Sequence, residues 1–150
     1  MIAPASETRR PAQQASPAGL LRRLGAMLYD SLLVLALWMF TLFPLVVVSN
    51  DFVYGPAVRS LLFLEMYLFF AYFWVRRGQT LGMLAWRLAL HNDDGGPLTL
   101  TQATLRFFGA LASFIALGLG YLWILVDPQR RSWSDLVSAS RVVKLPKKSA

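Results

Sequence analysis

The chain has 150 residues, 56% of them hydrophobic, and its mean hydropathy of +0.48 is above that of ordinary soluble proteins. Its net charge of +7 is compatible with nucleic-acid binding, but the basic residues flank apolar runs instead of interleaving with aromatic residues. The absence of cysteine excludes a disulfide framework, a zinc–cysteine cluster and a thiol nucleophile. These features indicate a one-domain integral membrane protein that meets the lipid bilayer and its anionic headgroups, and no nucleic acid.

The N-terminal part of the chain combines a polar tail with a first membrane span. Residues 1–20 are rich in Ala, Pro, Ser and Gln and are too polar for the core of a signal peptide. We expect a disordered tail there, a membrane domain over residues 21–145 and a basic C-terminal tail over residues 146–150. The apolar run at residues 24–48 is long enough to cross a bilayer. Four arginines precede it and the loop at 49–57 has no Lys or Arg, so the positive-inside rule predicts a cytoplasmic N-terminus.

The first span carries one carboxylate, Asp30, and begins beside Arg23. A charge at the centre of a spanning helix costs roughly 2.5–3.5 kcal/mol, so it is usually kept for a partner or a task. Arg23 and Asp30 are seven residues apart, which places them on one helix face with a rise of roughly 10 Å between them. We therefore expect both side chains to face the protein interior and to act as a coupled pair.

The second apolar run, residues 58–75, returns to a pair of arginines and carries Glu65. Counted from the inner face, Glu65 lies roughly 15 Å deep and Asp30 roughly 10 Å deep, so neighbouring antiparallel helices could bring them together. Two adjacent ionised carboxylates repel, and one would then hold a proton or both would share a cation. The alternative is that Glu65 reaches the outer headgroups or pairs with Arg59.

Residues 78–100 are the most polar part of the chain between apolar runs. Residues 86–91 alternate apolar and polar, and the turn sequence NDDGG then leads to PLTL, which predicts a small β-hairpin on the cytoplasmic face. A second alternating stretch, residues 140–145, could add a third strand. The single histidine, His91, has no Cys or second His to complete a ligand set, so we expect a surface residue and no metal site.

Residues 101–126 form the third apolar stretch, with Arg106 near its start and Gly118 and Gly120 late in it. A single crossing would put the basic C-terminal residues outside and would separate the two predicted strand regions by a membrane. A pair broken near residues 116–120 would return the tail, but each half is short for a full crossing. The predicted fold class is thus an all-α membrane protein with three apolar helical segments, the third either a single span or a broken, re-entrant pair, and a small cytoplasmic-face β-hairpin.

Several pieces of the chain resemble the RDD family of small bacterial membrane proteins, named for one arginine and two aspartates. They occur in order: RLGAMLYD at 23–30, GQTLG at 78–82, GGPL at 95–98, LR at 105–106, DPQRRSWSD at 127–135 and RVV at 141–143. The resemblance covers about residues 20–145. It implies that Arg23, Asp30 and Asp135 take the three defining positions and that the membrane is the bacterial inner membrane, crossed more than once.

The chain departs from the family pattern at three places. Met83 stands where the family often has Lys, Ser134 where His usually precedes the second aspartate, and Ala139 and Ser140 where Gly-Thr is common. The absence of that histidine removes a proton carrier beside Asp135. We therefore expect no role here that depends on its imidazole.

Two functions are consistent with these residues. Arg23, Asp30 and Asp135 form either a buried polar network that fixes helix register or part of a cation or proton site, because intramembrane carboxylates commonly mark ion paths. The residues available to such an ion site are Asp30, Glu65, Arg106 and Asp127.

The network interpretation predicts a structural or assembly partner in the membrane, working as a homo-oligomer or with other membrane proteins. The ion-site interpretation predicts a small transport module, and the family resemblance implies cation/proton exchange by an oligomer for this role. Small size favours the first, because transporters usually build their site between repeats and none is visible. Neither an enzyme nor a cofactor is expected, since the only histidine is poorly placed to activate a serine.

Overall fold

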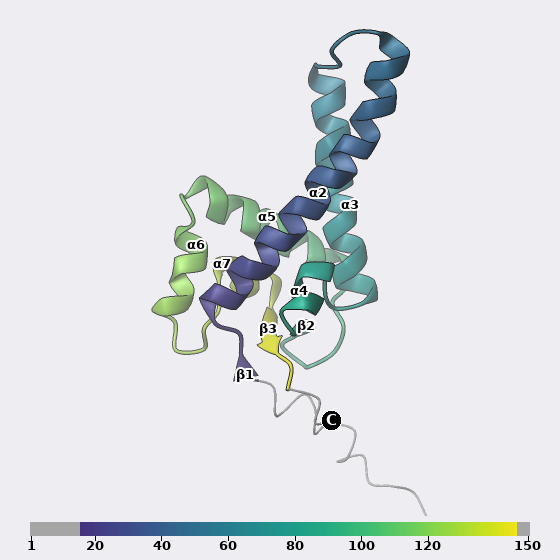
Figure 1. Ribbon diagram of the computed structural model, residues 1–150. Helices are drawn as coiled ribbons and strands as arrows, with labels where there is room; N and C mark the ends of the chain where they lie inside the picture. Colours follow the sequence, from purple (N-terminus) through teal and green to yellow (C-terminus); the bar gives the residue numbers. More distant parts are fainter. Residues whose placement is uncertain (1–15, 147–150) are drawn as a thin grey trace, which may run out of the picture.

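The computed structural model describes residues 16–146, and two long antiparallel helices dominate it. They are α2 (Leu20–Ser49) and α3 (Pro56–Arg76), and both are long and apolar enough to cross a membrane. α2 ends where Asn50 adopts a left-handed conformation, and α3 begins with a proline, whose missing N–H is not needed in the first turn. The far halves of both helices extend beyond every other element (Figure 1).

Secondary structure is present before residue 20, where the sequence pattern predicts none. Residues 16–20, which we assigned to a disordered tail, form the strand β1 (Ser16–Pro17) and lead directly into α2. β1 pairs with a strand from the C-terminal part of the chain, and the Ala18 N–H donates to the Val142 carbonyl oxygen at 3.1 Å. Tertiary pairing therefore orders a segment whose composition alone is that of a tail. The rest of that tail, and the C-terminal one beyond residue 146, lie outside the described residues.

A three-stranded antiparallel sheet of order β1-β3-β2 joins distant parts of the chain. β2 (Leu88–Asn92) pairs along its whole length with β3 (Ser140–Lys144), so residues 140–145 do supply a strand. The predicted hairpin partner is wrong. Residues 97–99 do not pair with β2, because Pro97 has no N–H for a strand ladder and Thr99 caps the next helix.

The third apolar stretch is broken. α5 (Leu100–Ile115) is followed by α6 (Leu119–Leu122) and the 3₁₀ helix η1 (Trp123–Leu125), which turn away from it by 106°. Leu117 and Gly118, at the break, both have positive φ angles of 58° and 82°. Glycine adopts this conformation without a steric cost, so the break falls within the region that the glycines indicate. A single straight span is excluded.

The sheet gives a second reason for the break. β1 precedes α2, β2 follows α3 and β3 follows the broken pair, yet the three strands lie together at one end of the helical hairpin (Figure 1). Strands that share backbone hydrogen bonds cannot be separated by the hydrocarbon layer. If α2 and α3 cross a membrane out and back, the broken pair must therefore begin and end on the same side of it.

The core lies where α3, α5, the sheet and the short helix α4 (Leu81–Ala85) meet. Phe107 of α5 packs edge-on against Phe63 and Tyr67 of α3, with ring centroids 5.5 and 5.4 Å apart. The Tyr67 hydroxyl also contacts the Thr104 hydroxyl at 2.7 Å. These contacts fix the rotation of α5, and they direct the neighbouring Arg106 toward the interior.

The last helix, α7 (Trp133–Ser138), packs closely on α5. Gly109 allows this approach, because a Cβ atom there would lie 2.9 Å from the Cα of Ser134. The close packing brings the start of α7 next to the charged side of α5.

Candidate functional site

Asp135, in the first turn of α7, is fully buried and joins three elements. Arg23 of α2 donates from Nη1 to its Oδ2 at 2.5 Å, and Arg106 of α5 donates from Nη1 to its Oδ1. The Ser132 N–H donates to Oδ2 at 3.1 Å, while the Ser132 hydroxyl accepts from the Asp135 N–H at 3.3 Å. We call Arg23, Arg106 and Asp135 the arginine–aspartate cluster.

The electrostatics of this cluster favour an ionised aspartate. Burial by itself would raise the pKa of Asp135, because it penalises the charged form, but the guanidinium groups of Arg106 and Arg23 hold that pKa below its ordinary value. The cluster therefore contains two positive groups and one negative group. The guanidinium carbon of Arg106 also lies 5.4 Å from the centre of the Trp74 ring, in a cation–π contact.

Arg23 holds further parts of the chain in place. Its Nη2 donates to the Arg130 carbonyl oxygen at 2.8 Å and its Nε to the Ala18 carbonyl oxygen at 3.3 Å. These acceptors belong to the loop before α7 and to the residue that follows β1. One side chain therefore connects the start of the described chain to its C-terminal part.

Asp30 belongs to a separate group on the same face of α2. Its Oδ2 accepts from the Thr80 hydroxyl at 2.5 Å and its Oδ1 from the Gly82 N–H at 2.8 Å. Thr80 in turn caps α4 by accepting from the Met83 N–H at 3.1 Å. A side chain at position 82 would not fit, since a Cβ atom would lie 2.2 Å from the Ala26 carbonyl oxygen.

The expected pairing of Arg23 with Asp30 is therefore wrong, although both are buried as expected. Arg23 reaches across to Asp135, while Asp30 binds α4. A helical repeat shows which residues share a face but not which element lies opposite each of them. The three defining residues thus contribute to two polar groups instead of one.

The two other candidate carboxylates lie elsewhere. Glu65 does not meet Asp30 or Arg59: its Oε1 accepts from the Thr41 hydroxyl at 2.6 Å between α2 and α3, and its buried Oε2 has no partner within residues 16–146. Asp127 accepts from the Arg131 N–H at 2.7 Å and shapes the loop before α7. Neither carboxylate is part of the arginine–aspartate cluster. His91 is half-buried in β2.

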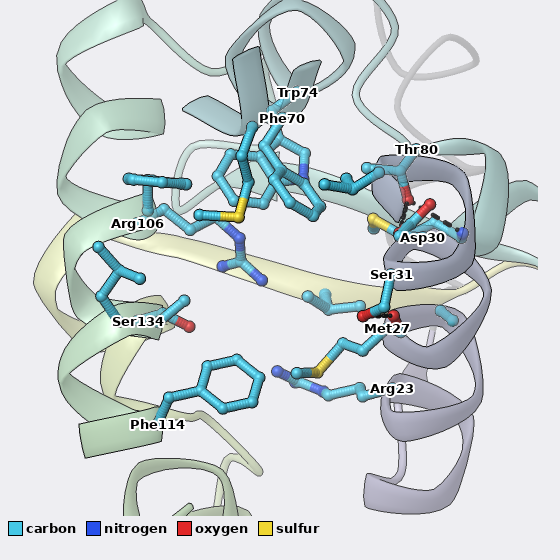
Figure 2. Close-up of a pocket in the computed structure, with 18 of the residues that line it drawn as sticks. Arg23, Met27, Asp30, Ser31, Phe70, Trp74, Thr80, Arg106, Phe114 and Ser134 are labelled. Atoms are coloured by element: carbon cyan, nitrogen blue, oxygen red, sulfur yellow. Dashed lines mark hydrogen bonds between the residues drawn. The ribbon is translucent and has the colours of Figure 1, made fainter. Parts of the chain in front are cut away.

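Both polar groups line one cavity of about 380 Å³ between α2, α3 and α5. Figure 2 shows Arg23 and Arg106 directed into this space from opposite walls, with Phe70 and Trp74 on one side and Phe114 on the other. Most of the remaining lining is apolar and comes from Val34, Leu35, Trp38, Met66 and Leu111. We call it the central cavity.

Sequence reasoning missed the polar residues that support these charges. Thr80, Ser132, Ser134, Ser138 and Ser140 are all buried. The Ser132 and Ser134 hydroxyls lie 2.8 Å apart, and the Ser140 hydroxyl accepts from Arg106 at 3.1 Å. The pattern Ser-x-x-Asp at residues 132–135 is a helix-capping signature and could have located the start of α7.

Comparison with known protein families supports the resemblance seen in the sequence. The model of the RDD family matches residues 17–139, a range that contains Arg23, Asp30 and Asp135. Searches of the curated proteins and of the solved structures gave no match.

Proposed function

Because the chain belongs to the RDD family and has apolar helices that fit a membrane protein, we propose that it is a structural component of the bacterial inner membrane. In this role it assembles with a second copy or with other membrane proteins. The observation that carries the proposal is that all three defining residues are bound to other parts of the same chain.

These contacts favour a network that holds the fold over an ion-exchange site. Asp135 already accepts from two arginines, and Asp30 from a hydroxyl and a backbone N–H, so protein donors occupy oxygens that would otherwise face a cation. Glu65, which would have to join Asp30 in a shared cation or proton site, binds Thr41 instead. Within residues 16–146, no three acidic or histidine side chains are grouped as metal ligands would be.

An exposed apolar stripe on α2 offers a surface for assembly. Leu28, Leu32, Leu35 and Met39 are 66%, 59%, 51% and 66% exposed. Their spacing of four, three and four residues places them along one helix face. In a membrane this stripe is covered by lipid or by another protein, and the proposal assigns it to a protein partner.

The distribution of charge supports a cytoplasmic N-terminus. Arg22, Arg87 and Lys144 surround a surface hollow at the sheet end of the molecule. The loop at the opposite end of the helical hairpin contains Asp51 and no Lys or Arg. Basic residues accumulate on the cytoplasmic side, where they also meet anionic headgroups.

Cysteine cross-linking in membrane vesicles tests the assembly. The chain has no native cysteine, so single cysteines introduced at Leu28, Leu32 and Met39 can be oxidised to disulfides without interference from other thiols of the chain. We expect cross-linked products at these three positions and few at Tyr29 and Phe40, which are exposed but lie roughly a quarter turn away on α2. Equal cross-linking on every face, or none, would contradict the proposed surface.

Ion flux tests the alternative function, a small transport module. Purified protein in liposomes carrying a pH-sensitive dye should not dissipate a proton gradient faster than empty liposomes when sodium or potassium is added. Flux that depends on the protein and is lost in Asp30→Asn, while the variant remains folded, would favour cation/proton exchange instead.

A further inference from the structure

Arg106 presents an unused hydrogen-bonding edge to the central cavity. The residue is only 8% exposed, and its hydrogen bonds to Asp135 and Ser140 both come from Nη1. Within residues 16–146, its Nε and Nη2 have no hydrogen-bond partner and are not fully buried, and the side chain of Arg106 lines the cavity. These two N–H donors are therefore free to bind an acceptor that enters the cavity.

The charge around this edge suits an anion. Arg23 and Arg106 together outweigh Asp135, so the cluster keeps an excess positive charge. Among the described residues that line the cavity, Asp30 contributes the one carboxylate, and it is engaged by Thr80 and Gly82. A guanidinium edge binds a phosphate or carboxylate group through parallel N–H donors.

The rest of the central cavity suits a hydrocarbon chain. Its lining on α2 runs from Arg23 to Trp38, a rise of roughly 22 Å, and is apolar beyond Ser31. A volume of about 380 Å³ spread over that length corresponds to a narrow channel. An α-helix, which is about 10–12 Å across, would not fit in it. Phe114 at the mouth is 62% exposed, so on the α5 side the cavity opens toward the part of the molecule that the bilayer would cover.

We infer that the central cavity binds one anionic phospholipid, with its phosphate at the free edge of Arg106 and one acyl chain along the apolar wall between α2 and α5 (Figure 2). The charged end lies near the sheet end of the molecule, where α2 begins, and a headgroup occupies the corresponding level of a bilayer. Basic pockets between membrane helices are known sites for such headgroups. The inference does not depend on the proposed assembly role.

Lipid titration of delipidated full-length protein in dodecyl maltoside tests the site. Native mass spectrometry should show one retained phosphatidylglycerol, bound at least tenfold more tightly than phosphatidylcholine with the same acyl chains. Inorganic phosphate at the same concentration should not compete, because it lacks the acyl chain. Equal retention of the two lipids, or full competition by phosphate, would overturn the inference.

A pair of alanines in α5 provides a matched control. Ala110 lines the central cavity, whereas Ala112 is exposed and does not. Ala110→Phe should weaken phosphatidylglycerol binding at least tenfold by filling the path of the acyl chain, and Ala112→Phe should bind as the unaltered protein does. If Ala110→Phe does not fold, Ser31→Phe at the exposed mouth replaces it, since Ser31 also lines the cavity. Undiminished binding in the folded blocking variant refutes the site.

Arg106→Lys examines the headgroup end. A lysine keeps a positive charge for Asp135 but lacks the flat edge that Arg106 offers, so the preference for phosphatidylglycerol over phosphatidylcholine should fall severalfold. An unchanged preference would remove Arg106 from the site. A lipid-free dimer that Ala110→Phe dissociates would assign the cavity to a second copy of the chain and would also overturn the inference.

Discussion

A buried carboxylate between two arginines stabilises a fold only as part of the complete set. Replacing both partners of a buried ion pair can leave the stability almost unchanged. Removing only one partner leaves an uncompensated charge in the protein interior, where water cannot solvate it. Asp135 is fully buried, and Arg23 and Arg106 are 5% and 8% exposed. The aspartate is therefore the most sensitive member, because its loss leaves two guanidinium groups facing each other.

Asp135→Asn should lower the free energy of unfolding by about 3–5 kcal/mol, measured by denaturant titration in detergent. Adding Arg23→Gln should cost less in this variant than in the unaltered protein, because the two side chains interact directly. The exposed pair of Asp93 and Arg141 is the control, and Asp93→Asn should cost at most about 1 kcal/mol. Additive losses for Arg23 and Asp135 would show that the pair is not coupled.

The lowered pKa of Asp135 predicts a specific acid sensitivity. A carboxyl group whose pKa is lower in the folded state stabilises the fold fully above its ordinary pKa of about 3.9, and that contribution is lost as the pH falls through the folded-state value. The unfolding midpoint should therefore decrease below about pH 4. The decrease should be smaller in Asp135→Asn, which has no carboxyl group there to protonate. Identical pH profiles for the two proteins would contradict this assignment.

At the scale of residues, the sequence predicted burial better than partnership. We predicted that Arg23 and Asp30 are buried, because a charge in the membrane is costly and the two residues share a helix face. Both are buried in the structure. Their partners come from 112 and 50 residues away along the chain, at Asp135 and Thr80. Local periodicity carries no information on which distant segment packs against a face. The grouping of Arg23 with Asp135 came from the family resemblance, and the capping pattern at Ser132, which was not used, could have located the start of α7.

At the scale of elements, α4 is positioned by two glycine contacts with α2. A Cβ atom at Gly82 would lie 2.2 Å from the Ala26 carbonyl oxygen, and one at Gly25 would lie 2.4 Å from the Trp86 ring. The backbones therefore approach closely enough for Asp30 to bind the first turn of α4. Small residues allow the same close packing between helices in membranes generally.

Gly82→Ala should therefore displace α4 from α2 and break the hydrogen bonds to Asp30. We expect a loss of about 2–4 kcal/mol, combining an overpacked contact with an unsatisfied buried carboxylate. Gly96→Ala is the matched control, because a Cβ there meets its nearest neighbour at 3.5 Å, an ordinary contact. Thermal unfolding in detergent separates the two variants, and equal stability would argue against close α4–α2 packing.

The sequence predicted only part of the secondary structure correctly. Two glycines after a long apolar run indicated where the third stretch breaks, because few other residues adopt a positive φ at low cost. The alternation at residues 86–91 indicated a strand, and β2 is that strand. Its partner was misassigned, since alternation defines the two faces of a strand but not the strand beside it.

At the scale of the whole molecule, the sheet constrains the path of the chain through a membrane. Its three strands come from before α2, after α3 and after the broken pair. Because they form one sheet, these three points of the chain must lie on the same side of the membrane. The sequence left a single third crossing open because length and hydropathy alone do not report on long-range strand pairing. The pairing of β1 and β3 with each other and of β3 with β2 is the information that was lacking.

Cysteine labelling in intact cells tests this path and the proposed orientation together. Single cysteines at Ser16 in β1, Lys144 in β3 and Ser49 at the far end of α2 report on the two ends of the helical hairpin. An impermeant thiol reagent should label Ser49→Cys from outside, and should reach Ser16→Cys and Lys144→Cys only after the cells are permeabilised. The two sheet positions must behave alike, because Ser16 and Lys144 face each other in the β1–β3 pair. External labelling of Lys144→Cys with Ser16→Cys protected would mean that the third apolar stretch crosses once, and that neither the sheet nor the contact of Arg23 with Asp135 exists in the membrane.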